Sequence, residues 1–142
     1  MNVQHILAQK GRQIEAASPD LTIADAILLL ASKRIGAVIV IDGAGAIAGI
    51  LSERDIVRAM VAGAHALEDR VRDHMTGLVV TCTSDTSVAD VMDLMTRGRF
   101  RHVPVVDEGE LVGIVSIGDI VKHRLAEIED EKSAIIAYIA AG

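Results

Sequence analysis

Aromatic side chains are nearly absent from this chain, which has no Trp, one Phe and one Tyr among 142 residues. Single-stranded nucleic acids bind largely by stacking their bases on aromatic side chains, so this mode of binding is nearly excluded. The net charge of −6 and the lack of a basic block argue against nucleic acid on electrostatic grounds as well. Because 51% of the residues are hydrophobic, the sequence predicts an aliphatic core.

A single cysteine and the lack of a long apolar run narrow the expected cellular context. Cys82 has no partner in the chain for a disulfide, which fits a reducing cytoplasm, and its place in the apolar run 79–82 predicts a buried packing role. Residues 1–5 have neither the basic nor the apolar region of a secretion signal. No apolar run reaches the roughly 20 residues of a membrane-spanning helix. We therefore expect a cytoplasmic protein without membrane association.

Patterns typical of catalytic or metal centres are also missing. The five histidines lack the spacings of zinc sites, and there is neither a nucleophile elbow nor a P-loop. The glycine-containing segment 43–46 is too short for a phosphate loop and lies between two predicted strands, where a turn is expected. We expect a non-enzyme without a catalytic cofactor and without a metal ion.

The chain does contain an internal duplication. Residues 49–55 read Gly-Ile-Leu-Ser-Glu-Arg-Asp, and residues 113–119 read Gly-Ile-Val-Ser-Ile-Gly-Asp. Over the longer ranges 49–60 and 113–124, six of twelve positions are identical. Each copy predicts a short apolar strand that runs into a helix, with Ser at the junction and Asp on the first helical turn.

Each of these Ser-x-x-Asp pairs, Ser52 with Asp55 and Ser116 with Asp119, has two interpretations. A helix N-terminus offers unpaired N–H groups, the Ser adds a hydroxyl, and a carboxylate can accept both hydroxyls of a ribose, so the set suits a nucleotide. The same spacing is that of a capping box, which satisfies backbone donors and binds nothing. The two roles are compatible, and the repetition of the pair strengthens the binding interpretation.

The elements around the pairs follow the same order in both halves. A short helical lead-in is expected over residues 1–11. The first half predicts a brief strand at 14–17, a helix from Thr22, strands at 37–41 and 47–51, and a helix at 53–61; the second predicts a strand at 79–82, a helix from Ser87, strands at 102–106 and 111–115, and a helix from Ser116. Two such copies should pack together about a pseudo-twofold axis and leave a cleft that both Ser-x-x-Asp helix starts border.

On these motifs the sequence resembles a tandem pair of CBS domains, the regulatory repeat named after cystathionine β-synthase. The resemblance spans about 8–62 and 73–125, and it is carried by residues 34–42 with 49–55 and residues 101–107 with 113–119. It implies an α/β (α+β) fold of two β-α-β-β-α repeats joined through their sheets, and dimerisation into a flat disc. It also implies an adenosine-containing ligand between the repeats: AMP, ADP, ATP, NAD or S-adenosylmethionine.

The resemblance further implies roles for individual residues. Asp55 and Asp119 would hold ribose, and Ser52 and Ser116 would meet ribose or phosphate. The backbone of Ile35, Gly36 and Ala37 would read adenine; a bend before a strand is the structural alternative for Gly36.

A second group of residues would meet phosphate. Arg101 and His102 match a basic pair that touches phosphates, with a solvated charge and a hydrogen-bonded strand end as the alternatives. Lys10 and Thr76 occupy similar places before the two repeats, and Lys10 could reach the same phosphates or remain solvated. Arg54 is either a phosphate clamp or the partner of a helix salt bridge. Because Arg54 faces Gly118 in the alignment of the copies, the two sites are not expected to be equivalent.

We divide the chain into repeat 1 at 1–70, including the lead-in helix, repeat 2 at 71–125, and a helical extension at 126–142. For the extension we favour dimer packing over a loosely attached tail or a membrane-surface helix, since it lacks a basic face. The functional hypothesis is a stand-alone regulatory homodimer that binds an adenine nucleotide and signals by a conformational change to a protein that the sequence does not identify. The alternative is a structural interaction module whose Ser-x-x-Asp pairs only cap helices.

Overall fold

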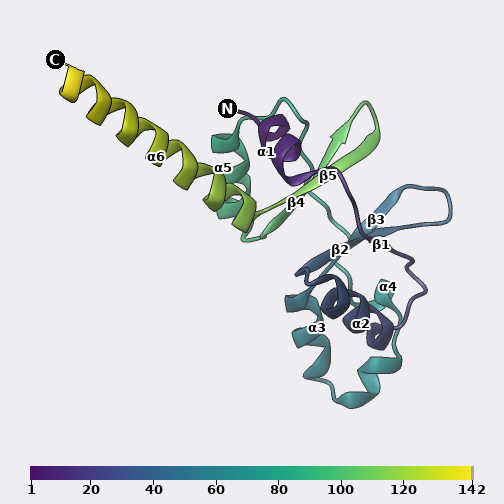
Figure 1. Cartoon of the computed structure of the whole chain (residues 1–142). Helices are drawn as coiled ribbons and strands as arrows, with labels where there is room; N and C mark the ends of the chain where they lie inside the picture. The colour runs from purple at the N-terminus through teal and green to yellow at the C-terminus, as the bar shows by residue number, and fades with distance from the viewer. Residues whose placement is uncertain (142) are drawn as a thin grey trace. The chain divides into compact units, whose positions relative to one another are not determined.

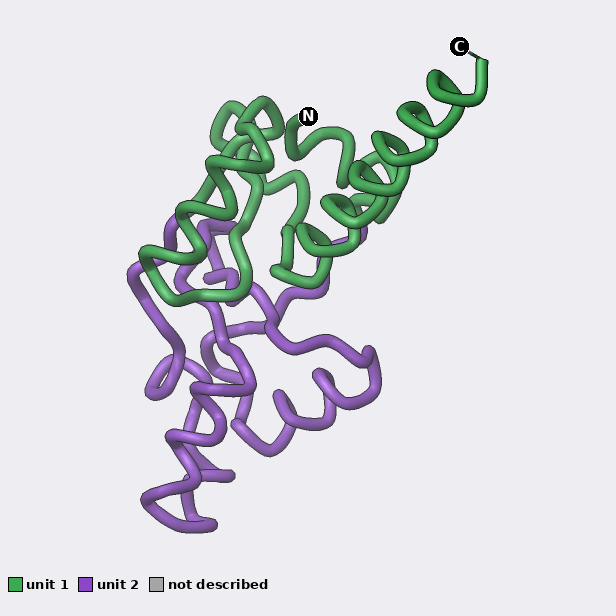
Figure 2. The backbone as a smooth tube through the Cα atoms, turned by 90° about the vertical axis from the view of Figure 1, so that its left-hand side faces the viewer, with its two compact units in different colours: residues 1–12, 81–142 green, residues 13–80 purple. Residues whose placement is uncertain are grey.

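The structure, a computed structural model, describes residues 1–141, which form two compact units of mixed helix and strand (Figures 1 and 2). Unit 1 comprises Met1–Arg12 and Thr81–Gly142, and unit 2 comprises Gln13–Val80. In sequence, unit 2 is therefore an insertion into unit 1. The mixed helix and strand content agrees with the expected fold class.

Unit 2 is built on a three-stranded sheet in the order β1-β2-β3. Strand β1 (Ala16–Ala17) is parallel to β2 (Ala37–Ile41), and β2 is antiparallel to β3 (Ile47–Ser52). Parallel neighbours need a crossover connection, which helix α2 (Ile23–Lys33) provides. Helix α3 (Glu53–Met60) continues directly from β3, followed by the 3₁₀ helix η1 (Ala64–Glu68) and helix α4 (Val71–His74).

The fully buried hydrophobic cluster of unit 2 consists of aliphatic side chains. Strand β2 reads Ala-Val-Ile-Val-Ile, and its first four residues are buried, as expected for a strand that is covered on both faces. Helix α2 contributes Ile23, Ala26 and Leu30, whose spacing places them on one side of the helix. Thr22 caps that helix by accepting a hydrogen bond from the backbone N–H of Asp25.

Unit 1 has a two-stranded antiparallel sheet of β4 (His102–Asp107) and β5 (Glu110–Ser116). Its helices are α1 (Val3–Lys10), α5 (Val88–Gly98) and α6 (Ile117–Ala141). The strand expected at 79–82 is reduced to one parallel bridge between Cys82 and Val105. Val80 is 38% exposed, so this apolar run does not enter the core as a strand would.

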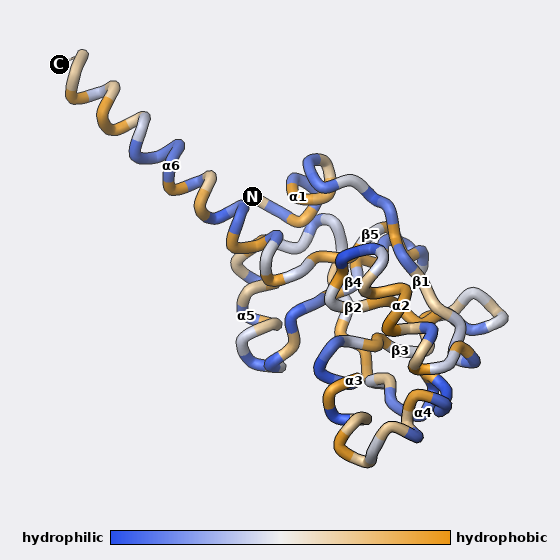
Figure 3. Tube along the Cα trace, turned by 60° about the horizontal axis from the view of Figure 1, so that its bottom comes forward, coloured by the Kyte–Doolittle hydropathy of each residue, from blue (hydrophilic) through white to orange (hydrophobic). Residues whose placement is uncertain are grey.

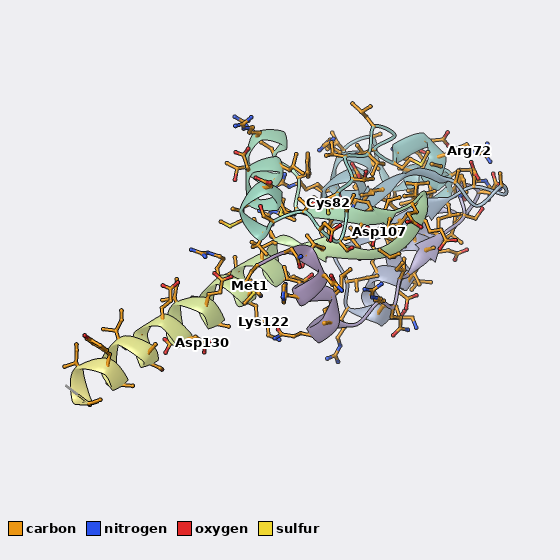
Figure 4. All side chains as sticks on the ribbon, turned by 90° about the horizontal axis from the view of Figure 1, so that it is seen from above. Met1, Arg72, Cys82, Asp107, Lys122 and Asp130 are labelled. Atoms are coloured by element: carbon orange, nitrogen blue, oxygen red, sulfur yellow. The ribbon has the colours of Figure 1, made fainter. Side chains whose placement is uncertain are left out.

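Cys82 itself is buried, as the sequence predicts. Burial, together with the nearby negative charge of Asp107, raises the pKa of the Cys82 thiol to about 11. Both residues are labelled in Figure 4, in the same part of unit 1. The thiol is therefore protonated at neutral pH and acts as a small apolar group.

The lead-in helix α1 differs from expectation, because it packs with the second repeat and not with the first. Val3, Ile6 and Leu7 belong to the core of unit 1, together with residues of β4, β5, α5 and α6. The backbone N–H of Val3 also donates to Thr86 O at 2.9 Å. A side chain at Gly113 would come within 2.7 Å of Leu7 Cδ2, so this glycine of β5 makes room for α1.

Candidate functional site

Helix α3 begins at Ser52 with a reciprocal capping box. The backbone N–H of Ser52 donates to Asp55 Oδ2 at 2.9 Å, and the Ser52 hydroxyl donates to the same oxygen at 3.0 Å. In return, the backbone N–H of Asp55 donates to Ser52 Oγ at 3.3 Å. The capping interpretation of this pair is thus confirmed, since each residue satisfies a donor that the helix start leaves open.

A third residue closes the other side of the Asp55 carboxylate. Thr76 Oγ1 donates to Asp55 Oδ1 at 3.2 Å, and the side chain of Asp55 is only 5% exposed. Thr76 is held there by two backbone hydrogen bonds to Ile50, of 3.0 and 2.9 Å. Gly49 permits this approach, because a Cβ atom at this position would lie 2.6 Å from Thr76 O. Asp55 therefore accepts hydrogen bonds from neutral donors on both of its oxygens, and the exposed Arg58 guanidinium lies 3.9 Å from Oδ1.

Helix α6 begins with the same geometry at Ser116. The backbone N–H of Ser116 donates to Asp119 Oδ2 at 2.9 Å, and that of Asp119 donates to Ser116 Oγ at 3.1 Å. Here the third partner is Lys10, whose ammonium donates to Asp119 Oδ2 at 2.6 Å and to Ile114 O at 2.8 Å. The Asp119 side chain keeps 22% of its surface exposed.

Electrostatics distinguish Asp119 from its counterpart. Burial by itself would raise the pKa of the Asp119 carboxyl, but the hydrogen bonds from Lys10 and Ser116, with the charge of Lys10, outweigh it and lower this pKa below its usual value. Asp119 is therefore a carboxylate throughout the neutral range, paired with a cation.

Lys10 and Thr76 were expected at similar places before the two repeats, and they have matching roles. Each lies beside the Ser-x-x-Asp pair of its own compact unit, Lys10 at Asp119 and Thr76 at Asp55. Because Lys10 belongs to unit 1, it meets the carboxylate of the second repeat, and its ammonium bonds a carboxylate in this structure. This role of Lys10 was not predicted from the sequence.

The segments expected to touch adenine and phosphate also occupy matching positions. In the strand registers, Ala37 pairs with Ser52 and His102 pairs with Ser116. The first backbone N–H of α3 donates to Gly36 O at 3.0 Å, and that of α6 donates to Arg101 O at 2.8 Å.

These bonds place the backbone of both segments directly beside the helix starts. Ile35 is held by a backbone hydrogen bond, in which its N–H donates to Leu30 O at 3.1 Å. Arg54 and Arg101 are exposed.

A shallow pocket of about 70 Å³ adjoins Asp119 within unit 1. It is lined by Ile6, Gln9, Lys10, Asp119, Lys122 and His123. Lys122 and His123 are three and four residues after Asp119, so they share its side of α6; this spacing could have identified them from the sequence.

The imidazole of His123 is 7% exposed, and its Nε2 lies 2.9 Å from Glu127 Oε1. Ligand pockets usually exceed about 300 Å³, so this pocket fits only part of a nucleoside.

The described part of the chain contains neither a metal-binding cluster nor a membrane-crossing helix. Among residues 1–141, no group of three or more His, Cys, Asp or Glu side chains is arranged to hold a metal ion. Over the same residues, no helix combines the length and apolarity that crossing a bilayer requires.

Comparison with known proteins identifies the repeats. The family model described as "CBS domain" matches twice, at residues 11–62 and 71–126. A mitochondrial CBS domain-containing protein of Arabidopsis thaliana, CBSX3, is 32% identical over 99% of this chain and 72% of its own length.

Solved structures agree with this result. The CBS-domain containing protein ATU1752 of Agrobacterium tumefaciens is 44% identical, with a TM-score of 0.85 over 87% of this chain and 92% of that one. The CBS domain pair of protein MJ0100 was crystallised with 5′-methylthioadenosine and S-adenosyl-L-methionine. It is 28% identical, with a TM-score of 0.76 over 86% of this chain and 98% of that one.

Proposed function

Because the chain belongs to the CBS-domain family and carries a pair of these domains, we propose that it is a non-catalytic regulatory protein whose ligand contains adenosine. The complex of MJ0100 with two adenosine derivatives supports this ligand class. AMP, ATP and NAD fall in the same class, as does S-adenosylmethionine. The cleft between the repeats, where the sequence analysis expects this ligand, stays a prediction.

The observation that carries the proposal is the helix start at Asp119. Its carboxylate is ionised, partly exposed and able to accept hydroxyl hydrogens, as a ribose diol requires. Lys10 and Lys122 line the same pocket and would attract a phosphate or another anionic group. A carboxylate that can accept hydroxyl hydrogens and two ammonium groups that can donate to a phosphate thus line the same pocket of unit 1.

The same geometry suggests how binding changes the conformation. A ligand hydroxyl that bonds Asp119 competes with Lys10, which is the last residue of α1. Competition at the carboxylate would weaken the attachment of α1, so the bound and free states would differ in the stability of this helix. A ligand acts as a signal only when it binds two such states unequally. Hydrogen exchange of the α1 amides, with and without ligand, measures this difference.

The binding test is a calorimetric titration with AMP, ATP, NADH, 5′-methylthioadenosine and S-adenosylmethionine. Asp119→Asn keeps the size of the side chain and removes its charge, and we expect it to weaken binding about tenfold, since hydrogen bonds to a charged group contribute about 1.5–3 kcal/mol.

Asp90→Asn is the matched control, because Asp90 follows Ser87 with the same spacing on an exposed helix start. Equal affinity of the Asp119→Asn variant and the control would contradict the site.

A structural interaction module remains the second candidate, and the pair Ser52–Asp55 is the observation that favours it. The carboxylate of Asp55 is already held by Ser52 and Thr76, as in a cap with no further role. If none of the five ligands binds to the folded protein, this second function replaces the first.

A further inference from the structure

Helix α6 carries an apolar face that the described part of the chain leaves uncovered. All residues from 128 to 141 are exposed, and Figure 2 shows this part of the helix extending away from the rest of unit 1. Apolar and polar residues alternate along it in Figure 3, and Asp130 marks it in Figure 4. Isolated helices of this length are marginal in water, so an apolar face of this kind calls for a partner.

The apolar residues follow a heptad repeat. Successive spacings of four, three, four, three and four residues join the members of what we call the seam: Val121, Leu125, Ile128, Lys132, Ile135 and Ile139. Each apolar member is half exposed or more. Leu125, Lys132 and Ile139 occupy the a positions of the heptad, while Val121, Ile128 and Ile135 occupy the d positions.

The seam is separate from the face by which α6 packs on its own unit. Ile120 and His123 are the buried residues of α6. At about 100° per residue, they lie roughly a third of a turn away from the seam. The seam can therefore take a partner without disturbing the attachment of α6 to unit 1.

We propose that the seam joins α6 to the same helix of a second copy of the chain in a parallel, two-stranded coiled coil. A strict seven-residue spacing keeps an apolar stripe facing one partner helix along its whole length. This goes beyond a dimer formed by the CBS domains, because it assigns a specific helix, direction and register.

The charges beside the seam make the helix complementary to itself in the parallel direction. Arg124 is at a g position. Its guanidinium pairs with Glu127 of its own helix, and in a parallel pair it also faces Glu129, the e residue five positions later, of the second copy. An antiparallel pair centred between Ile128 and Lys132 would place Glu129 opposite Glu129 and Glu131 opposite Glu131. Like charges at these places are unfavourable. A parallel pair also places Lys132 opposite Lys132, but each ammonium can leave the seam toward Glu131, so the parallel direction is favoured.

Lys132 sets the register and the number of strands. A lysine at one a position is tolerated where its ammonium can leave the seam, and the neighbouring g residue Glu131 offers it a partner. Two strands leave this exit open, whereas four strands would enclose four ammonium groups. Leu at a with Ile at d otherwise favours three or four strands, so Lys132 is the residue that selects two.

Disulfide cross-linking reports the relative direction of the two α6 helices, whatever other contacts join the copies. In the full chain with Cys82→Ala, Ile135→Cys places identical d residues face to face in a parallel pair, and oxidation should link the copies. Ala137→Cys, on the opposite side of α6, is the control and should yield severalfold less linked dimer. Equal yields, or no linked Ile135→Cys dimer, would overturn the parallel arrangement.

Sedimentation equilibrium of the full chain tests the seam and its stoichiometry. Ile128→Ser with Ile135→Ser should weaken association at least about tenfold, whereas the outward-facing Ala126→Ser with Ala137→Ser should leave it unchanged. Lys132→Ile should tighten association and shift it beyond two copies. A wild-type assembly of four chains, or equal association of the two double variants, would refute a two-stranded seam.

Discussion

Asp55 and Asp119 occupy matching positions in the two repeats and share one capping geometry, but their third partners differ in charge. A threonine hydroxyl closes Asp55, and a lysine ammonium pairs with Asp119. The first carboxylate is almost fully buried, while the second keeps about a fifth of its surface. The duplication thus kept the backbone geometry and changed the electrostatics, which separates an almost fully buried helix cap from a partly exposed carboxylate that pairs with a cation.

The largest expected effect concerns the close approach of Thr76 to Gly49, which brings the Thr76 hydroxyl to Asp55. Gly49→Ala should lower the free energy of unfolding by about 3 kcal/mol, because the new methyl group meets the backbone oxygen of Thr76 at 2.6 Å. Gly113→Ala meets only the movable end of the Leu7 side chain and should cost about 1 kcal/mol. Urea denaturation measures both, and a reversed order would contradict the rigid closure of Asp55.

Removing the carboxylates compares the two caps directly. Asp55→Ala should cost about 2 kcal/mol of unfolding free energy, since it removes a carboxylate that is only 5% exposed and leaves partly buried donors of Ser52 and Thr76 without a partner. Asp119→Ala should cost about 1 kcal/mol, because solvent reaches its partners. The exposed Asp90→Ala serves as control in the same urea titrations. Equal losses at Asp55 and Asp119 would show that burial does not separate them.

Replacing Thr76 and Lys10 compares the stability that a neutral and a charged partner of the carboxylate contribute. Thr76→Val should cost about 1 kcal/mol at any ionic strength, as for one hydrogen bond between a neutral donor and a partly buried acceptor. Lys10→Met should cost less than about 1 kcal/mol, and its effect should shrink as salt is added, because the ion pair is partly exposed. Thermal unfolding in low and high sodium chloride reads the difference; a salt-dependent Thr76→Val effect would be inconsistent with this assignment.

The smallest expected effect is a dependence on acid pH. Because the folded pKa of Asp119 lies below its ordinary 3.8, the stability that ionised Asp119 contributes is present above that value and is lost as pH falls through the folded pKa. Lys10→Met should raise the folded pKa and so reduce this acid-dependent loss. Titration of the Asp119 carboxyl by NMR gives the pKa in both proteins, and an unchanged value would exclude Lys10 as a cause.

The features that were predictable from the sequence depend on neighbours in the chain. The β-branched run of β2 and the Ser-x-x-Asp caps of α3 and α6 are set by residues within a few positions, so local pattern was enough. The resemblance of the repeats to CBS domains also rested on such local motifs, and the family model confirms it.

The features that were missed depend on distant partners. Lys10 and Asp119 are 109 positions apart, and no local pattern records that α1 packs beside β5. The run at 79–82 has the composition of a buried strand. A strand also needs a neighbouring strand that pairs with it along its length, and that depends on distant parts of the chain. The single bridge of this run at Cys82 and the 38% exposure of Val80 show that apolar composition does not by itself establish a buried strand.

The insertion of unit 2 within unit 1 has a consequence for synthesis of the chain. Residues 3–10 leave the ribosome early, but the strands and helices that bury Val3, Ile6 and Leu7 all lie beyond residue 80. Unit 2 is synthesised completely before the chain beyond residue 80, so it can fold while the apolar face of α1 is still uncovered. A nascent chain stalled just after residue 80 has emerged from the ribosome should therefore be a good substrate for chaperones that bind short apolar segments.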